Sequence, residues 1–359
     1  MTNQPSVSSQ VSAAETTAAS TKEASGKGTD ISADTPVLLL TNLGTPKTPT
    51  TKDVRRYLRE FLSDQRIIEM PRFVWKPILE GIILRVRPAQ SAEKYRSVWL
   101  EEGSPLLHYT TQQAKLLTDR LGIRVVPAMR YGEPALGDVL DELMAAGHRR
   151  IGILSAYPQY SATTIASVND AVCAWMQENR DHPQIRFSRS FPSDPHYIEA
   201  LVGAIEDSWS QNGRPDFEGG DRVLLSYHSI PVSMHKAGDP YHSECLATTE
   251  AVRERLGLSA QECVATFQSV FGPSEWLKPA TINTVEDLAK AGTGRVDVIC
   301  PGFVSDCLET LEEIDQLNRE TFLEAGGSEF HYVPWGNDFD RAIDALEVQA
   351  RALLSGWGE

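Results

Sequence analysis

Two sixteen-residue stretches decide the fold: VLDELMAAGHRRIGIL (residues 139–154) and TVEDLAKAGTGRVDVI (residues 284–299). Each has the apolar spacing of an amphipathic helix, then a glycine that stops the helix, then a basic residue that leads into an apolar run. Upstream of them, MRYG (129–132) corresponds in position to VFG (270–272). The chain therefore carries one helix–strand unit twice, and internal duplication explains this better than chance.

The repeat extends backwards to PVLLLTNLGTP (36–46) and RVLLSYHSIP (222–231), each an apolar run that ends in a turn. Runs rich in Val, Ile and Leu, separated by helical stretches, are typical of parallel strands buried on both faces. We therefore predict an α/β fold of two Rossmann-like domains with parallel sheets related by internal duplication. The predicted parts are a disordered tail (1–35), domain 1 (36–190), domain 2 with the metal site (191–335), a hinge near 185–200, and a C-terminal helix (336–359) packed back on domain 1.

The composition excludes several classes of protein. A net charge of −15 disfavours nucleic acid as a partner, because phosphate backbones are bound by Lys and Arg. The five cysteines show no CxxC spacing, which argues against a disulfide framework or a cysteine-based metal motif and favours a reducing cytoplasm. No GxGxxG follows the first strand, and neither a P-loop nor a GxSxG motif occurs. No run of about eighteen apolar residues and no secretory signal is visible, so we expect a cytoplasmic location.

In open α/β sheets, ligands bind beyond the carboxyl ends of the strands. Four segments in which polar or aromatic residues interrupt apolar runs are candidates, two from each half of the chain. A cleft between the domains would bring them together. The segments are Asn42–Pro46, Ala156–Thr164, Tyr227–Pro231 and Pro301–Thr310.

His228 directly follows an apolar strand, which sets it apart from the other histidines. A neutral imidazole is both a base near pH 7 and a metal ligand. The alternative is a histidine whose ring is satisfied by backbone groups at a strand end. The acidic segment described next makes the functional reading the better one.

The acidic segment is DCLETLEEID (306–315), in which Asp306, Glu309 and Glu313 would share one face of a helix. Like charges stacked in this way repel, and a cation would relieve the repulsion. The alternative is a solvated acidic face that is stabilised by the helix N-terminus. Because the segment follows the carboxyl end of a predicted strand, the metal-ligand interpretation is as well supported as the solvated acidic face.

Residues 67–85 are strongly apolar but are broken by Pro71 and Pro77, so they do not form a spanning helix. This segment either forms a lip over a hydrophobic site and touches a membrane surface, or it packs on the sheet as a buried helix.

At these motifs the sequence resembles the ferrochelatase family over nearly the whole chain from Val37. The resemblance is specific because so many motifs occur in order. They are LLLTNLGTP, EKYRSVWLEEGSPL, MRYGEP, YPQYSATT, SYHSIP, GDPYHSEC, FQSVFGPSEWLKP and GFVSDCLETLEEID.

The resemblance implies an enzyme that inserts Fe²⁺ into protoporphyrin IX, the terminal step of heme biosynthesis. It implies that His228 and Glu309 face each other across the metal and that Glu313 passes metal or protons. Leu43 stands where coproporphyrin-using relatives carry tyrosine, which favours protoporphyrin IX. The implied porphyrin-binding residues are Leu43, Arg130, Tyr131, Tyr157, Ser161, Trp276 and Phe303.

Two departures from the family pattern bear on cofactors. Ala162 stands where cluster-bearing members place a cysteine, and no cysteine cluster precedes Glu359, so we expect no iron–sulfur cluster. Cys307 occupies a position that is histidine in some members. Fe²⁺ is expected as substrate, with no permanently bound cofactor. The alternatives are a chelatase for cobalt, nickel or another tetrapyrrole such as coproporphyrin, and a non-catalytic heme-binding protein.

Overall fold

The computed structural model describes residues 35–272 and 274–357, and in it the first sheet has the order β2-β1-β3-β4. All pairings in this sheet are parallel, and β1 lies between β2 and β3. The strands are β1 (Val37–Thr45), β2 (Val125–Gly132), β3 (Arg150–Ser155) and β4 (Gln184–Phe187).

The helices of this half begin and end where the local sequence favours it. Thr50 accepts a hydrogen bond from the Asp53 N–H at the start of the first helix, and Gly122 ends α4 in the left-handed conformation. The helices are α1 (Thr51–Ser63), α2 (Arg72–Ile78), the π-helical turn η1 (Leu79–Ile83), α3 (Leu84–Val98), α4 (Pro105–Leu121), α5 (Leu136–Ala145), the π-helical turn η2 (Ala162–Ala166) and α6 (Ser167–Glu178).

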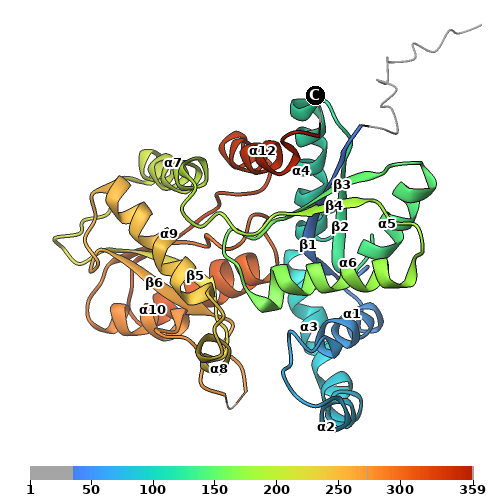
Figure 1. The fold of residues 1–359 in the computed structure, drawn as a ribbon. Coiled ribbons are helices and arrows are strands. Elements are labelled where there is room, and N and C mark those ends of the chain that lie inside the picture. Colours follow the sequence, from blue (N-terminus) through green and yellow to red (C-terminus); the bar gives the residue numbers. More distant parts are fainter. Residues whose placement is uncertain (1–34, 273, 358–359) are drawn as a thin grey trace, which may run out of the picture. The chain divides into compact units, whose positions relative to one another are not determined.

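The second sheet repeats this arrangement with the order β6-β5-β7-β8, again parallel throughout (Figure 1). The two stretches that opened the sequence argument become α5–β3 and α10–β7, so the predicted duplicated α/β fold is confirmed. The elements are α7 (Pro195–Asn212), β5 (Arg222–His228), α8 (Val232–Lys236), α9 (Tyr241–Leu256), β6 (Cys263–Gln268), α10 (Thr281–Lys290), β7 (Arg295–Ile299), the π-helix η3 (Glu309–Asn318), α11 (Arg319–Glu324), β8 (Glu329–Val333) and α12 (Asp340–Leu354).

Side chains alternate between the two faces of the sheet along β1, so the core has one layer on each face. Val37 and Leu39 pack with α5 and α6, whereas Leu38 and Leu40 pack with α4, α7 and α12. The second of these clusters continues into β5 and α9 of the second half. Residues 35–272 and 274–357 therefore belong to one compact unit that contains both sheets. Below, residues 36–190 are called the first half and residues 191–335 the second half.

The apolar segment at residues 67–85 is not a buried helix on the sheet, as one alternative proposed. It forms α2, η1 and the start of α3, and several of its large side chains face solvent. Phe73 is 82% exposed and Ile82 is 59% exposed, while Leu79 and Leu84 are buried and anchor the segment.

The predicted disordered tail lies outside the described residues, apart from Thr35. None of the helices in residues 35–272 and 274–357 is long and apolar enough to cross a membrane.

Candidate active site

His228 is the last residue of β5, at the carboxyl edge of the second sheet. Its Nδ1 atom lies 2.7 Å from the carbonyl oxygen of Ser229. A carbonyl oxygen can only accept, so Nδ1 carries the hydrogen and Nε2 of the neutral ring keeps its lone pair. The half-buried imidazole therefore presents one oriented nitrogen as a base or a metal ligand.

Glu313 lies close enough to both His228 and Glu309 for their charges to act on it. Burial raises the pKa of Glu313, while hydrogen bonds from Ser269, and the positive charge that His228 carries when it is protonated, act against that rise. The Ser269 N–H donates to Oε1 at 2.6 Å, and the Ser269 hydroxyl donates to Oε2 at 2.5 Å. The structure thus brings His228, Glu309 and Glu313 into one electrostatic group.

A buried polar chain fixes the start of η3 against the sheet. The side-chain amide of Gln268, at the end of β6, donates to the Glu309 carbonyl at 2.8 Å. The Ser226 hydroxyl, on the neighbouring β5, donates to the Gln268 side-chain oxygen at 2.7 Å. Two adjacent strands therefore set the position of the helix that carries Glu309 and Glu313.

Sequence reasoning did not identify a group of first-half residues near Glu309, here called the first-half wall: Tyr57, Arg87 and Tyr95. Burial raises the pKa of Tyr57 and of Tyr95, and the negative charge of Glu309 adds to both shifts. Burial lowers the pKa of Arg87, and the charge of Glu309 opposes that shift. Helices α1 and α3 therefore place two phenols and a guanidinium near the Glu309 carboxylate.

Arg130 and Tyr131, two predicted pocket residues, converge on Asp64, which the sequence argument had missed. Asp64 Oδ2 accepts from Arg130 Nη2 and from the Tyr131 hydroxyl, each at 2.7 Å, and from the Ser167 hydroxyl at 2.6 Å. Burial alone would raise the pKa of Asp64, but the hydrogen bonds and the Arg130 charge hold it below its usual value. Asp64 is therefore an ionised hub that orients both residues.

A polar cavity of about 580 Å³ adjoins this hub. Its lining includes Arg130 and Tyr131 but none of His228, Glu309 and Glu313. All the residues that line the cavity belong to the first half.

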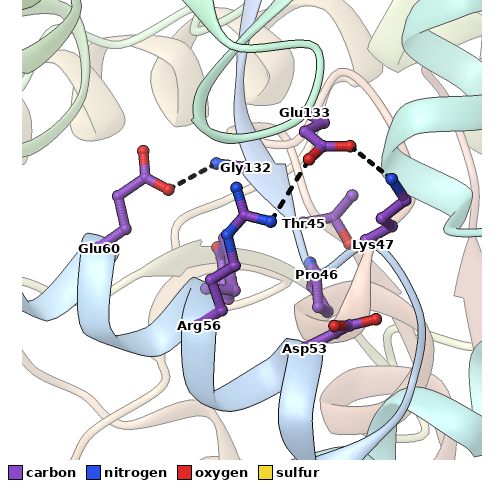
Figure 2. A pocket seen from close by; sticks show the side chains of 9 residues that line it. Thr45, Pro46, Lys47, Asp53, Arg56, Glu60, Gly132 and Glu133 are labelled. Carbon is purple, nitrogen blue, oxygen red and sulfur yellow. Dashed lines mark hydrogen bonds and ion pairs between the residues drawn. The ribbon is translucent and has the colours of Figure 1, made fainter.

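A smaller cavity of about 20 Å³ lies behind the ends of β1 and β2 (Figure 2). Glu133 pairs with Lys47 at 3.0 Å and with Arg56 at 3.5 Å, and Glu60 accepts the Gly132 N–H at 3.1 Å. The space admits about one water molecule, so it is not a substrate site. The interactions around this cavity connect α1 to the end of β2, the strand that carries Arg130 and Tyr131.

The other predicted pocket residues separate into two groups. Leu43 packs in one apolar cluster with Tyr57, Tyr95, Tyr131 and Leu308, the residue before Glu309. Tyr157 is near Tyr131: burial raises the pKa of Tyr157, and the negative charge of an ionised Tyr131 adds to the rise. The Tyr157 hydroxyl has no hydrogen-bond partner in the described part of the chain.

Ser161, Trp276 and Phe303 all make contacts with second-half residues. Ser161 donates to Asp239 at 3.0 Å and so links the first half to the α8–α9 loop. Trp276 packs on Phe271 with ring centres 4.9 Å apart. Phe303 packs against the second-half core beside β7.

The acidic segment differs from the expected single helical face. Glu309 begins a π-helix, whereas Asp306 precedes it and is buried. The Asp306 carboxylate accepts from Thr310 at 2.7 Å, from Asn337 at 2.7 Å and from Tyr332. Asp306 is thus satisfied internally and does not share one helical face with Glu309 and Glu313.

No three His, Cys, Asp or Glu side chains in residues 35–272 and 274–357 form a set able to hold a metal ion. Burial raises the pKa of the Cys307 thiol, and the negative charge of Glu309 raises it further. A neutral thiol is a poor ligand, because metals bind the thiolate. The protein groups that remain for a cation here are the His228 nitrogen and the Glu309 and Glu313 carboxylates, which do not form a three-ligand set by themselves.

Comparisons with known proteins show which family this chain resembles. The Ferrochelatase family model matches residues 36–352. A ferrochelatase of Methylibium petroleiphilum is 52% identical over 325 residues, covering 89% of this chain and 88% of the relative. A ferrochelatase of Azoarcus sp. is 49% identical over 324 residues, with the same coverage of 89% and 88%.

Two solved structures share the fold at low sequence identity. SirB from Bacillus subtilis with Fe³⁺ gives a TM-score of 0.55 at 10% identity, covering 89% of this chain and 96% of that one. The sirohydrochlorin chelatase SirB from Bacillus subtilis subspecies spizizenii, in complex with cobalt, gives 0.51 at 10% identity, covering 90% and 98%. At this identity the likeness shows the fold alone.

Proposed function

The chain belongs to the ferrochelatase family, and we propose that it inserts Fe²⁺ into protoporphyrin IX to give protoheme, with release of two protons. The observation that carries the proposal is the electrostatic group of His228, Glu309 and Glu313 at the carboxyl edge of the second sheet. The leucine at position 43 favours protoporphyrin IX over coproporphyrin as the substrate.

Insertion of Fe²⁺ requires removal of two pyrrole protons and replacement of the metal's water ligands. The unprotonated Nε2 of His228 accepts a proton or contacts the metal from one side of the macrocycle. Glu309 holds the cation, and its charge offsets part of the metal's charge. Glu313, whose pKa is raised by burial, accepts and passes on a proton.

The small number of protein ligands suits a metal that is a substrate. A closed set of three or four ligands would retain Fe²⁺. Here the four porphyrin nitrogens complete the coordination, so the metal passes from the protein groups to the product. The wall formed by Tyr57, Arg87 and Tyr95 bounds the other side of the site.

The decisive measurement is heme formation from Fe²⁺ and protoporphyrin IX under anaerobic conditions. His228→Ala and Glu309→Ala are expected to fold normally and to lose about 10²- to 10⁴-fold in kcat, the range for loss of a general base or a charge stabiliser. The matched control is His182→Ala, because His182 is exposed and lies outside the site.

Full activity in either variant would contradict the assigned roles. The same assay with Co²⁺, Ni²⁺ and coproporphyrin tests the other chelatase functions. Tight heme binding without turnover would instead indicate a heme-binding protein.

We also propose that residues 67–85 contact a membrane surface peripherally. Phe73 and Ile82 are largely exposed on α2 and η1, and Val86 at the start of α3 is 60% exposed. Exposed apolar side chains on one short helical segment are typical of interfacial helices. Trp75 is less suited to this role because its indole donates to the Leu62 carbonyl at 2.6 Å.

Flotation with liposomes tests this contact. Phe73→Ser/Ile82→Ser is expected to move the protein from the floating fraction to the bottom fraction and leave its secondary structure unchanged. Leu317→Ser, at a residue that is 41% exposed on η3, is the control. Equal flotation of all three proteins would exclude the segment as the contact.

A further inference from the structure

An ion pair between Lys94 and Glu312 joins α3 of the first half to η3 of the second half. Lys94 Nζ lies 2.8 Å from Glu312 Oε1 and 3.0 Å from Oε2, so the ammonium group contacts both carboxylate oxygens. The Glu312 side chain is only 15% exposed, while that of Lys94 is 48% exposed. Solvent therefore screens this pair less than a pair on an open surface.

Along the sequence, Glu312 lies between Glu309 and Glu313, the two carboxylates assigned to the reaction. Glu309, Glu312 and Glu313 lie within five consecutive residues of one helix, and their negative charges repel one another. Glu313 is held by Ser269 and Glu309 is needed for the cation, whereas Glu312 pairs outward with Lys94. Lys94 therefore offsets part of the repulsion and fixes one side of η3.

The same helix α3 contacts the second half at another place. The Arg87 guanidinium lies over the Phe271 ring, 4.9 Å from its centre. Residues 87 and 94 are seven positions apart and so lie on one face of the helix. Tyr95, the neighbour of Lys94, is near Glu309. This face of α3 is thus the part of the first half that meets the catalytic helix.

We propose that Lys94 and Glu312 form a positioning pair that sets the place of η3, and hence of the Glu309 carboxylate, relative to the first-half wall during metal insertion. This inference rests on the proposed function. Neither residue takes part in the chemical reaction. Because each half supplies one partner, the pair forms only when the two halves have the relative position that insertion needs.

The test uses steady-state insertion of Fe²⁺ into protoporphyrin IX by the full chain. Lys94→Met keeps the aliphatic stem and removes the charge, and Glu312→Gln keeps the shape. Each is expected to lower kcat by about three- to tenfold and to change KM for porphyrin by less than about twofold. The exchanged variant Lys94→Glu/Glu312→Lys should recover at least about half of the wild-type kcat.

Salt gives a second readout. Raising NaCl to 0.5 M should lower kcat of the wild type and leave Lys94→Met unaffected, because the pair is partly exposed. Lys290→Met, which removes an exposed pair with Glu286 on α10, is the matched control and should behave as wild type.

The outcomes separate the two proposals. A wild-type protein that forms no metalloporphyrin refutes the proposed function. An active wild type with single variants within twofold of its kcat refutes the positioning role. The positioning role is also refuted if kcat falls in both single variants and the exchanged variant does not restore it. A lower melting temperature with unchanged kcat refutes it as well.

Discussion

At the residue scale, the backbone of Ser269 accounts for the placement of Glu313. Its φ of 64° lies in the left-handed region, which is uncommon for a residue with a side chain. This conformation lets both the Ser269 N–H and its hydroxyl donate to the two oxygens of one carboxylate. A residue held in a sparsely populated conformation beside reactive groups is typical of functional sites.

Removal of the Ser269 hydroxyl should therefore change how activity depends on pH. In Ser269→Ala the carboxylate loses one donor, so the pKa of Glu313, already raised by burial, rises further. The proton-accepting form is lost as pH falls through that pKa. The acid limb of kcat/KM should thus move to higher pH by about one pH unit, measured by heme formation.

Ser243→Ala, at an exposed position on α9, controls for loss of a hydroxyl and should leave the acid limb in place. An unchanged limb in Ser269→Ala would show that Glu313 does not control this pH dependence.

Asp64 shows the opposite shift and gives a prediction about stability. Its folded-state pKa lies below the ordinary value, so its ionised form stabilises the fold above about pH 4, and this contribution is lost as pH falls through the folded pKa. Asp64→Asn should lower the free energy of unfolding at pH 7 by about 1–3 kcal/mol. In urea unfolding, the difference between the two proteins should shrink below about pH 4. A difference independent of pH would rule out the charge as its cause.

At the element scale, the contact of β1 with β2 depends on Gly44. Its φ is +108°, and a Cβ atom there would lie 1.7 Å from the Tyr131 carbonyl oxygen. Only glycine therefore lets the two strands stay paired beside Leu43, Arg130 and Tyr131.

Gly44→Ala should destabilise the protein by at least about 3 kcal/mol, because the left-handed backbone and the overlap with a carbonyl both cost free energy. Chemical denaturation measures this loss. Gly81→Ala is the matched control, since a Cβ at Gly81 meets nothing within 4 Å, and it should change stability by less than about 1 kcal/mol. Equal effects of the two substitutions would contradict the structural reason.

At the scale of the whole molecule, the sequence predicts the repeated strands and helices because their patterns are local. His228 and Glu309 could be predicted as site residues because they directly follow or lie shortly after apolar runs, whose carboxyl ends meet at one sheet edge. Tyr57 and Arg87 were missed because they lie on helices whose contact with the second half depends on packing between distant segments. Asp306 was misplaced because the helix was expected to include it, whereas the helix begins after it and hydrogen bonds from distant residues hold its carboxylate in the interior.

The two halves are also held together by a buried amide that no local pattern indicates. Gln113, on α4, is fully buried and donates to the Val304 carbonyl at 2.8 Å and to the Asn337 carbonyl at 2.9 Å. Its side-chain oxygen accepts from the Ser305 hydroxyl at 3.3 Å. One first-half side chain thus satisfies three groups beside the loop that leads to η3.

Gln113→Met keeps the volume of this side chain and removes all three hydrogen bonds. The Val304 carbonyl still accepts from the Asn337 N–H at 2.8 Å, and the Ser305 hydroxyl still lies 3.4 Å from the Thr110 hydroxyl, so the Asn337 carbonyl is the group that loses its partner. Because a buried polar group without a partner costs about 1–3 kcal/mol, we expect the free energy of unfolding to fall by about 1–3 kcal/mol. Gln177→Met, at an exposed site on α6, is the matched control and should change it by less than about 0.5 kcal/mol. Guanidinium unfolding followed by circular dichroism measures both variants. If Gln113→Met were as stable as the control, the buried amide would not be what joins α4 to the second half, and the shared apolar core of β1, β5 and α12 would have to carry that role alone.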